Sequence, residues 1–89
     1  MKHVCTQRTD LDELIGGEQA VVCDRECRYV FRYGPLAEAM RRDEELVLEN
    51  SASLSLPMRA KIRMLLDRLF IAETEELIQP GHRFRVIMA

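Results

Sequence analysis

The sequence predicts an α+β domain in which two longer helices and one short helix pack on one face of a small, mainly antiparallel sheet of about four strands. Three observations lead to this fold class. Alternating apolar and polar residues mark strands near both ends of the chain and in its first half, apolar residues with helical spacing fill most of the second half, and 89 residues have room for one core. Residues 1–89 are therefore expected to form a single compact domain.

The first two expected elements are a strand and a short helix. Residues 2–7 alternate as a strand does. Thr9 or Asp10 can cap the helix that follows, because their side-chain oxygens can accept the unpaired N–H groups of its acidic first turn. Gly16 and Gly17 then end this helix.

A hairpin is expected next. Residues 19–23 and 28–33 are rich in β-favouring residues, and the polar segment 24–27 between them is typical of a turn. In the second run the aromatic side chains share one face, and such a stripe indicates a face that packs on the core. If that face were exposed instead, it could stack single-stranded bases. The aromatic residues are Tyr29, Phe31 and Tyr33.

Two helices and a strand complete the expected order. Pro35 suits the first position of a helix over residues 36–50, and a serine-rich stretch follows that helix. Ser55 can cap a second helix over 56–79, either continuous or interrupted near Thr74, which could itself cap a final turn, and a proline and a glycine stop it. Residues 82–88 alternate again and are expected to form the closing strand.

Composition narrows the function classes. The net charge of −2 argues against a general nucleic-acid binder, whose affinity would need an excess of basic residues. The chain has no apolar run near the roughly 20 residues that a membrane span needs, and its first residues lack the apolar segment of a secretory signal. With an odd number of cysteines, 3, these features predict a cytoplasmic protein without a disulfide framework and without a membrane partner.

The long second helix is the strongest candidate for a binding surface. On the side nearly opposite its main apolar stripe, a second apolar row repeats every seven residues. This row must be covered by another element of the fold or by a partner, either a second copy or another protein. If a partner covers the row, Ile71→Asp is expected to abolish association and leave the fold intact. The candidate partner-binding residues are the row Met64, Ile71 and Ile78 with the polar rim Asp67 and Arg68.

Arginines offer an alternative site for an anion or a nucleic acid. One basic group flanks the main stripe of the long helix, and a second lies on two predicted strands that would form one surface if they were neighbours. Solvated edges and ion pairs to acidic residues account for the same pattern. The residues are Arg59, Lys61 and Arg63 on the helix, and Arg28, Arg32, Arg83 and Arg85 on the strands.

A zinc site is a second alternative. Cys23 and Cys27 flank the hairpin turn at a spacing within the range of paired zinc ligands, and His3 and Cys5 share one face of the first strand. Together these four residues could form a Cys₃His site. The turn lacks the usual two-residue spacing and glycines, so a small buried Cys23 and a partly exposed thiol at Cys27 fit the pattern as well.

The sequence contains no recognisable catalytic set. It has only 2 histidines, no Gly-Lys-Ser or Gly-Lys-Thr sequence, and no loop with the glycine and glutamate spacing of a calcium site. We therefore expect a small non-enzymatic interaction or regulatory protein without a cofactor, which docks on a macromolecule, by preference a protein. An adaptor, a subunit or a compact inhibitor such as mobile elements encode would fit. The alternatives are a nucleic-acid-binding regulator that uses an arginine-rich face and a small zinc-stabilised module.

Overall fold

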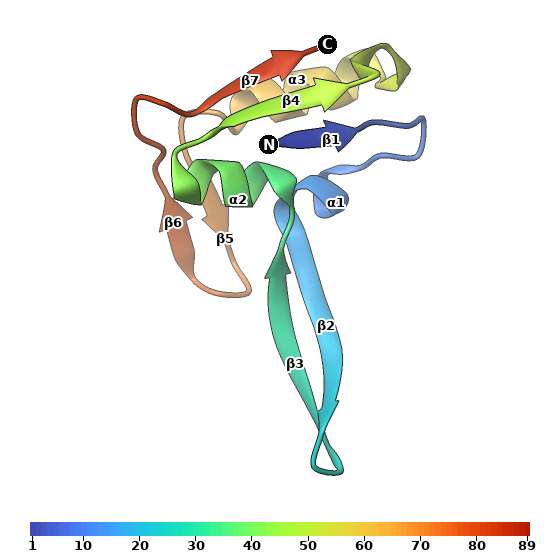
Figure 1. Ribbon diagram of the computed structural model, residues 1–89, viewed down its shortest axis with the longest axis vertical. Coiled ribbons are helices and arrows are strands. Elements are labelled where there is room, and N and C mark those ends of the chain that lie inside the picture. The colour runs from blue at the N-terminus through green and yellow to red at the C-terminus, as the bar shows by residue number, and fades with distance from the viewer.

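The structure, a computed structural model, describes residues 1–89 with the exception of the side chain of Cys23. Figure 1 shows how helices and strands follow one another along the chain. Their bounds are β1 (Lys2–Val4), α1 (Leu11–Ile15), β2 (Gly16–Cys23), β3 (Glu26–Tyr33), α2 (Pro35–Arg42), β4 (Glu45–Glu49), the 3₁₀ helix η1 (Ser51–Ser53), α3 (Leu56–Met64), β5 (Leu69–Ile71), β6 (Glu76–Ile78) and β7 (Arg85–Met88).

The strands of the described chain form three separate sheets. Strand β4 lies between β1 and β7 in a parallel sheet, whereas β2–β3 and β5–β6 are antiparallel hairpins. The α+β class is therefore right, but the predicted single, mainly antiparallel sheet of about four strands is wrong. The physical reason is that the chain joins β1 to β4 and β4 to β7 through long crossovers that contain helices, and such crossovers permit parallel pairing.

The predicted helix over 36–50 is two elements. Helix α2 ends at Arg42, and its C-cap Asp43 adopts the left-handed backbone conformation with φ 55°. The Asp43 carboxylate then accepts the backbone N–H groups of Arg83 at 3.0 Å and Phe84 at 2.9 Å, which fixes the loop before β7. Strand β4 follows over Glu45–Glu49, with two buried leucines alternating with half-buried residues. Buried residues at every second position are typical of a strand that covers the core with one face.

The predicted helix over 56–79 is also wrong beyond Met64. The chain turns after α3 and forms the hairpin β5–β6. The buried residues Leu69 and Ile71 of β5 alternate with an exposed Phe70, which is the pattern of a strand that covers a core with one face. The seven-residue row that defined the candidate partner surface therefore does not lie on one helix.

Three predicted helix starts are confirmed. The Asp10 carboxylate accepts the Glu13 N–H at 2.9 Å at the start of α1, and Ser55 Oγ accepts the Met58 N–H at 3.2 Å at the start of α3. Pro35 occupies the beginning of α2, where its missing N–H costs no helix hydrogen bond.

A cluster of buried apolar side chains joins the parallel sheet, the helices and the inner face of β5–β6. Figure 1 shows α3 behind the parallel sheet, while hairpin β2–β3 extends away from the rest of the fold along the longest dimension, 43 Å. No helix in the described part of the chain has the length and apolar composition needed to cross a lipid bilayer. The buried apolar residues are Cys5, Leu14, Leu36, Ala37, Ala39, Met40, Leu46, Leu48, Leu54, Ile62, Leu69, Ile71 and Ile78.

Candidate functional site

The projecting hairpin β2–β3, which we call the arm, is the most distinctive surface of the molecule (Figure 1). Its register is continuous from Gly16 paired with Tyr33 to Cys23 paired with Glu26. The sequence therefore predicted the hairpin correctly, but the turn is shorter than the four residues expected. Asp24 and its neighbour in the turn both have positive φ, 48° and 68°, as a two-residue type I′ turn requires.

The arm leaves the body through two glycines whose conformations and close contacts a side chain would disturb. Gly16 ends α1 and begins β2 with φ 121°. Gly34 follows the other strand directly. Its N–H donates to the Ile15 carbonyl at 2.9 Å, and a Cβ on Gly34 would overlap the backbone carbonyls of Glu13 and Leu14. The root of the arm is thus held by close backbone packing against α1.

Apart from Glu18, which lies opposite Phe31, one face of the arm is apolar along most of its length. The register places Ala20 and Val22 on the same face as the aromatic residues of β3. Near the root, Phe31 and Tyr33 are half-buried and meet edge to face with ring centroids 5.2 Å apart. Farther out, Val22 is 77% and Tyr29 is 72% exposed. The predicted aromatic stripe therefore packs on the core only at its root end.

The opposite face of the arm is mixed and polar. Arg28 lies there beside Glu26 at 3.3 Å, and Val30 is exposed between Arg28 and Arg32. Residues 16–33 contain 3 acidic and 3 basic residues, so that the arm as a whole is neutral. A neutral arm has no excess of cations to attract a phosphate backbone.

A polar contact joins the root of the arm to the body. The Tyr33 hydroxyl donates to a Glu76 carboxylate oxygen at 2.5 Å, and the Arg41 guanidinium lies 3.3 Å from the other Glu76 oxygen and 4.1 Å above the centre of the Tyr33 ring. The hydrogen bond to Glu76, together with burial, raises the pKa of Tyr33. Strand β3 is therefore tied to β6 and α2 at this point.

The Tyr33 contact predicts a loss of stability at alkaline pH. Because the folded-state pKa lies above the unfolded value of 10.0, the stabilisation is complete below that pH and disappears as pH rises through the folded pKa. We expect the free energy of unfolding of the wild type to exceed that of Tyr33→Phe at neutral pH, and this difference to shrink above pH 10.0. Urea titrations at stepped pH would measure it. Tyr29→Phe is the control, and a difference that stays constant with pH would contradict the prediction.

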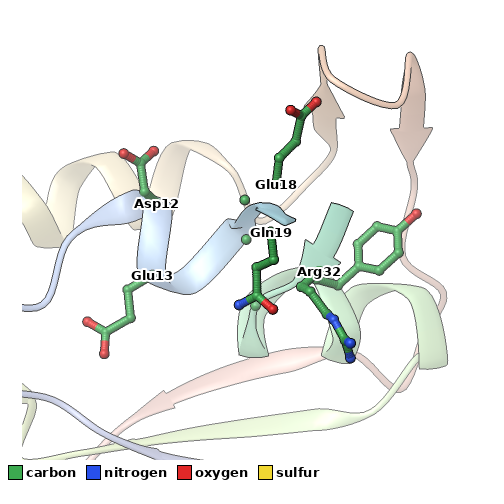
Figure 2. A pocket seen from close by; sticks show the side chains of 9 residues that line it. Asp12, Glu13, Glu18, Gln19 and Arg32 are labelled. Atoms are coloured by element: carbon green, nitrogen blue, oxygen red, sulfur yellow. The ribbon is translucent and has the colours of Figure 1, made fainter. Parts of the chain in front are cut away.

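An open depression lies where α1 meets the root of the arm. Its volume is about 410 Å³, and its lining includes the acidic residues Asp12, Glu13 and Glu18 with a single cation, Arg32. Figure 2 shows the Asp12 and Glu13 carboxylates pointing in opposite directions from α1, while Gln19 and Arg32 come from the two strands of the arm. The carboxylates do not converge on a common point as metal ligands would. The depression therefore contributes an acidic surface next to the β2 strand.

The candidate zinc ligands lie in different parts of the fold. Cys5 is buried in the core and His3 is half-buried, whereas Cys27 is exposed near the far end of the arm. The side chain of Cys23 lies outside the described residues. Among the residues that are described, no three histidine, cysteine or acidic side chains gather as a metal site would require. The geometry does not bring the predicted set together.

His3 and Cys5 do lie close to an acidic residue, but their chemistry is not that of a nucleophilic site. His3 Nε2 is 3.7 Å from a Glu13 oxygen, and no atom in the described part of the chain forms a hydrogen bond with this nitrogen. Burial, and to a smaller extent the Glu13 charge, raises the pKa of the Cys5 thiol. A nucleophilic cysteine needs a lowered pKa, so this thiol remains protonated near neutral pH.

The candidate partner row is divided between core and surface. Ile71 and Ile78 are buried in the core on hairpin β5–β6, whereas Met64, at the end of α3, is 81% exposed. Asp67 and Arg68 are exposed in the connection to β5. The structure thus leaves these three residues on the surface but removes the apolar row that was to anchor a partner.

The candidate arginine surface is not assembled either. Strands β3 and β7 belong to different sheets, so Arg28 and Arg32 are not cross-strand neighbours of Arg83 and Arg85. Arg85 instead contacts Glu45 at 2.7 Å. On α3, Lys61 and Arg63 are exposed, whereas Arg59 is half-buried and donates to the Ser51 carbonyl at 3.0 Å.

The sequence interpretation missed two exposed apolar surfaces. The outer part of the arm was assigned to the core because periodicity shows which residues share a face but not whether that face is covered. On the body, Phe70 and Leu77 form a directly opposed and exposed pair on the outer side of β5–β6. Recognising β5 and β6 as strands would have found this pair, since each shows the alternation of period two.

No protein-family model matches the chain, and no curated protein matches it.

Proposed function

We propose that this chain is a small non-enzymatic interaction protein that docks on another protein through the apolar face of its arm. The observation that carries the proposal is the exposure of Val22 and Tyr29 on a ribbon held away from the body. Large apolar side chains exposed together on a projecting element are typical of contact surfaces. The closely packed glycine root and the Tyr33–Glu76 contact support it, because they hold the base of the arm against the rest of the fold.

An exposed aromatic residue suits such a contact. Tyr29 offers a large, rigid ring with a polar tip, and tyrosine is one of the residues that dominate binding energy in protein interfaces. The neutral charge of the arm favours a partner groove that is apolar rather than strongly charged. Such a surface would serve the chain equally as an adaptor, a subunit or a compact inhibitor.

The test compares two double variants as bait in lysate of the source cells. Val22→Ser with Tyr29→Ser removes the apolar face of the arm, whereas Phe70→Ser with Leu77→Ser removes the exposed pair on the body. We expect a partner that the wild type and the body variant retain and the arm variant loses. With the purified partner, calorimetry is expected to show at least a roughly 30-fold loss of affinity, since truncation of a single anchoring tyrosine costs about 2 kcal/mol or more.

Two results would contradict the proposal. Retention of the partner by the arm variant would show that the arm is not the contact surface. An affinity that falls by a factor of about 10³ or more between 50 and 200 mM salt would show a phosphate-dependent contact with nucleic acid, because apolar docking depends weakly on salt.

A further inference from the structure

The outer edge of β2 is an unprotected strand edge. Between Gly16 and Cys23 the strand contains no proline and no lysine, and its register with β3 is continuous. Natural proteins use proline, charged residues, above all lysine, or bulges to prevent such edges from pairing, and Glu18 is the single charged residue of this strand. On the other side of the arm, the hydrogen bond between Tyr33 and Glu76 places β6 near the root of β3. The β2 edge is therefore the more accessible template for another strand.

The alternation of hydrogen-bonded and non-hydrogen-bonded pairs along the hairpin determines which backbone groups of β2 point outward from this edge. Cys23 and Glu26 flank a two-residue turn, and the pair that closes such a turn is hydrogen-bonded. Hydrogen-bonded pairs then alternate with non-hydrogen-bonded ones, so that the N–H and C=O groups of Glu18, Ala20 and Val22 point outward from the ribbon. Another strand could accept and donate hydrogen bonds at these positions.

We propose that a second copy of the chain pairs with this edge, β2 against β2 in antiparallel orientation, around a two-fold axis at Ala20. In this register Ala20 lies opposite Ala20 of the other copy, and Glu18 lies opposite Val22. The residues whose backbone groups point outward, Glu18, Ala20 and Val22, then each lie opposite a residue of the other copy whose backbone groups also point outward. The two arms become one four-stranded ribbon, which is more stable in water than two isolated hairpins.

The distribution of charge favours this register over the neighbouring ones and favours a second copy of the chain as the partner of the β2 edge. Moving the axis to Val21 would place Glu18 opposite Asp24 of the other copy twice, and like charges directly opposite one another destabilise a sheet. Moving it to Gln19 would drive the turn of the other copy into α1, since β2 begins at Gly16. With the axis at Ala20, the turn of each copy lies at the root of the other, where Asp24 is opposite Gly16 and Arg25 is beside the depression that Asp12, Glu13 and Glu18 line. The second copy thus supplies the cation that this acidic surface attracts.

This inference does not depend on the proposed docking function. The pairing uses the edge of the arm, whereas the docking function uses its apolar face, and the symmetric register places the apolar faces of both arms on the same side of the ribbon. A dimer would present Val22 and Tyr29 twice to a partner. A failure of either idea leaves the other intact.

The experiment measures solution mass by sedimentation equilibrium up to about 0.5 mM chain, a range that detects weak dimers. The wild type is expected to approach twice the chain mass of 10.4 kDa. Ala20→Pro removes an outward-facing N–H and is expected to remain monomeric. Tyr29→Pro removes the outward-facing N–H directly opposite, on the β3 edge, and is expected to dimerise like the wild type.

Charge reversal tests the register without touching the backbone. Arg25→Glu is expected to be monomeric, because it sets a carboxylate against the acidic depression. Asp12→Lys with Glu18→Lys is expected to be monomeric for the opposite reason. An equimolar mixture of the two variants is expected to form a heterodimer, since each contact then joins opposite charges. A monomeric wild type, a dimer that survives Ala20→Pro, or a mixture that stays monomeric would each overturn the proposal.

Discussion

Ile71→Asp is expected to unfold the protein, whereas Phe70→Asp is expected to change its free energy of unfolding by only about 0.5 kcal/mol. The two residues are adjacent in β5, but Ile71 is 1% exposed and Phe70 is 61% exposed. A carboxylate at Ile71 would have to be buried without a partner among apolar side chains, at a cost of about 4 kcal/mol or more. That is comparable with the whole stability of a small domain, which is about 5 to 15 kcal/mol.

Urea unfolding followed by circular dichroism would measure both variants, with Leu77→Asp as a second surface control. A folded Ile71→Asp protein of near wild-type stability would contradict the packing of hairpin β5–β6 on the core. The expected result also reverses what the sequence pattern suggested. With Ile71 on the outer face of a long helix, the same substitution should have abolished association without affecting the fold.

The two expectations for Ile71→Asp differ because the spacing of apolar residues alone does not distinguish a long helix from short strands. Spacings of seven residues occur by chance between short strands, and Met64, Ile71 and Ile78 fit a helical row although a turn separates each from the next. The local alternation in Leu69–Ile71 and Glu76–Ile78 is only three residues long. Such short strands carry too few residues to outweigh a helical pattern, and their pairing is decided by contacts with the rest of the core.

Elements with a local cause were predicted well. The cap at Asp10, the cap at Ser55 and the start of α2 at Pro35 each depend on hydrogen bonds or sterics within a few residues. The hairpin was also predicted, because two β-favouring runs flank a polar turn, although the strands extend beyond those runs to 8 residues each. The parallel sheet was not, since β4 is central only through contacts with β1 and β7, which are distant in sequence.

The arm was predicted only in part, because its strands have a local cause whereas its exposure does not. The sequence identified the strands of the arm and the face shared by Tyr29, Phe31 and Tyr33, and the register confirms that face. It could not show that the fold ends beneath Phe31 and leaves Tyr29 in solvent, because this depends on where the body stops. The glycines at the root offered a local signal, since Gly16 must adopt a conformation that side chains disfavour.

Gly16→Ala is expected to lower the free energy of unfolding by about 3 kcal/mol or more, whereas Gly17→Ala is expected to leave it unchanged or raise it by up to about 1 kcal/mol. The backbone of Gly16, with φ 121° and ψ −176°, lies in a region that is essentially restricted to glycine. A Cβ there would also overlap the Arg32 carbonyl oxygen and approach the Gly34 nitrogen to 2.8 Å. Around Gly17, no described atom lies within 4 Å of the added carbon.

This pair of variants tests how the arm is held, because both positions lie in β2 beside one another and receive the same methyl group. Urea midpoints would measure the difference, and amide spectra would show whether the shifts in Gly16→Ala concentrate at the junction of α1 with the arm. Equal stability of the two variants would mean that the root does not need the glycine conformation. If the expected difference is found, the direction of the arm is fixed by backbone geometry at Gly16, and any partner meets a surface that is already oriented before binding.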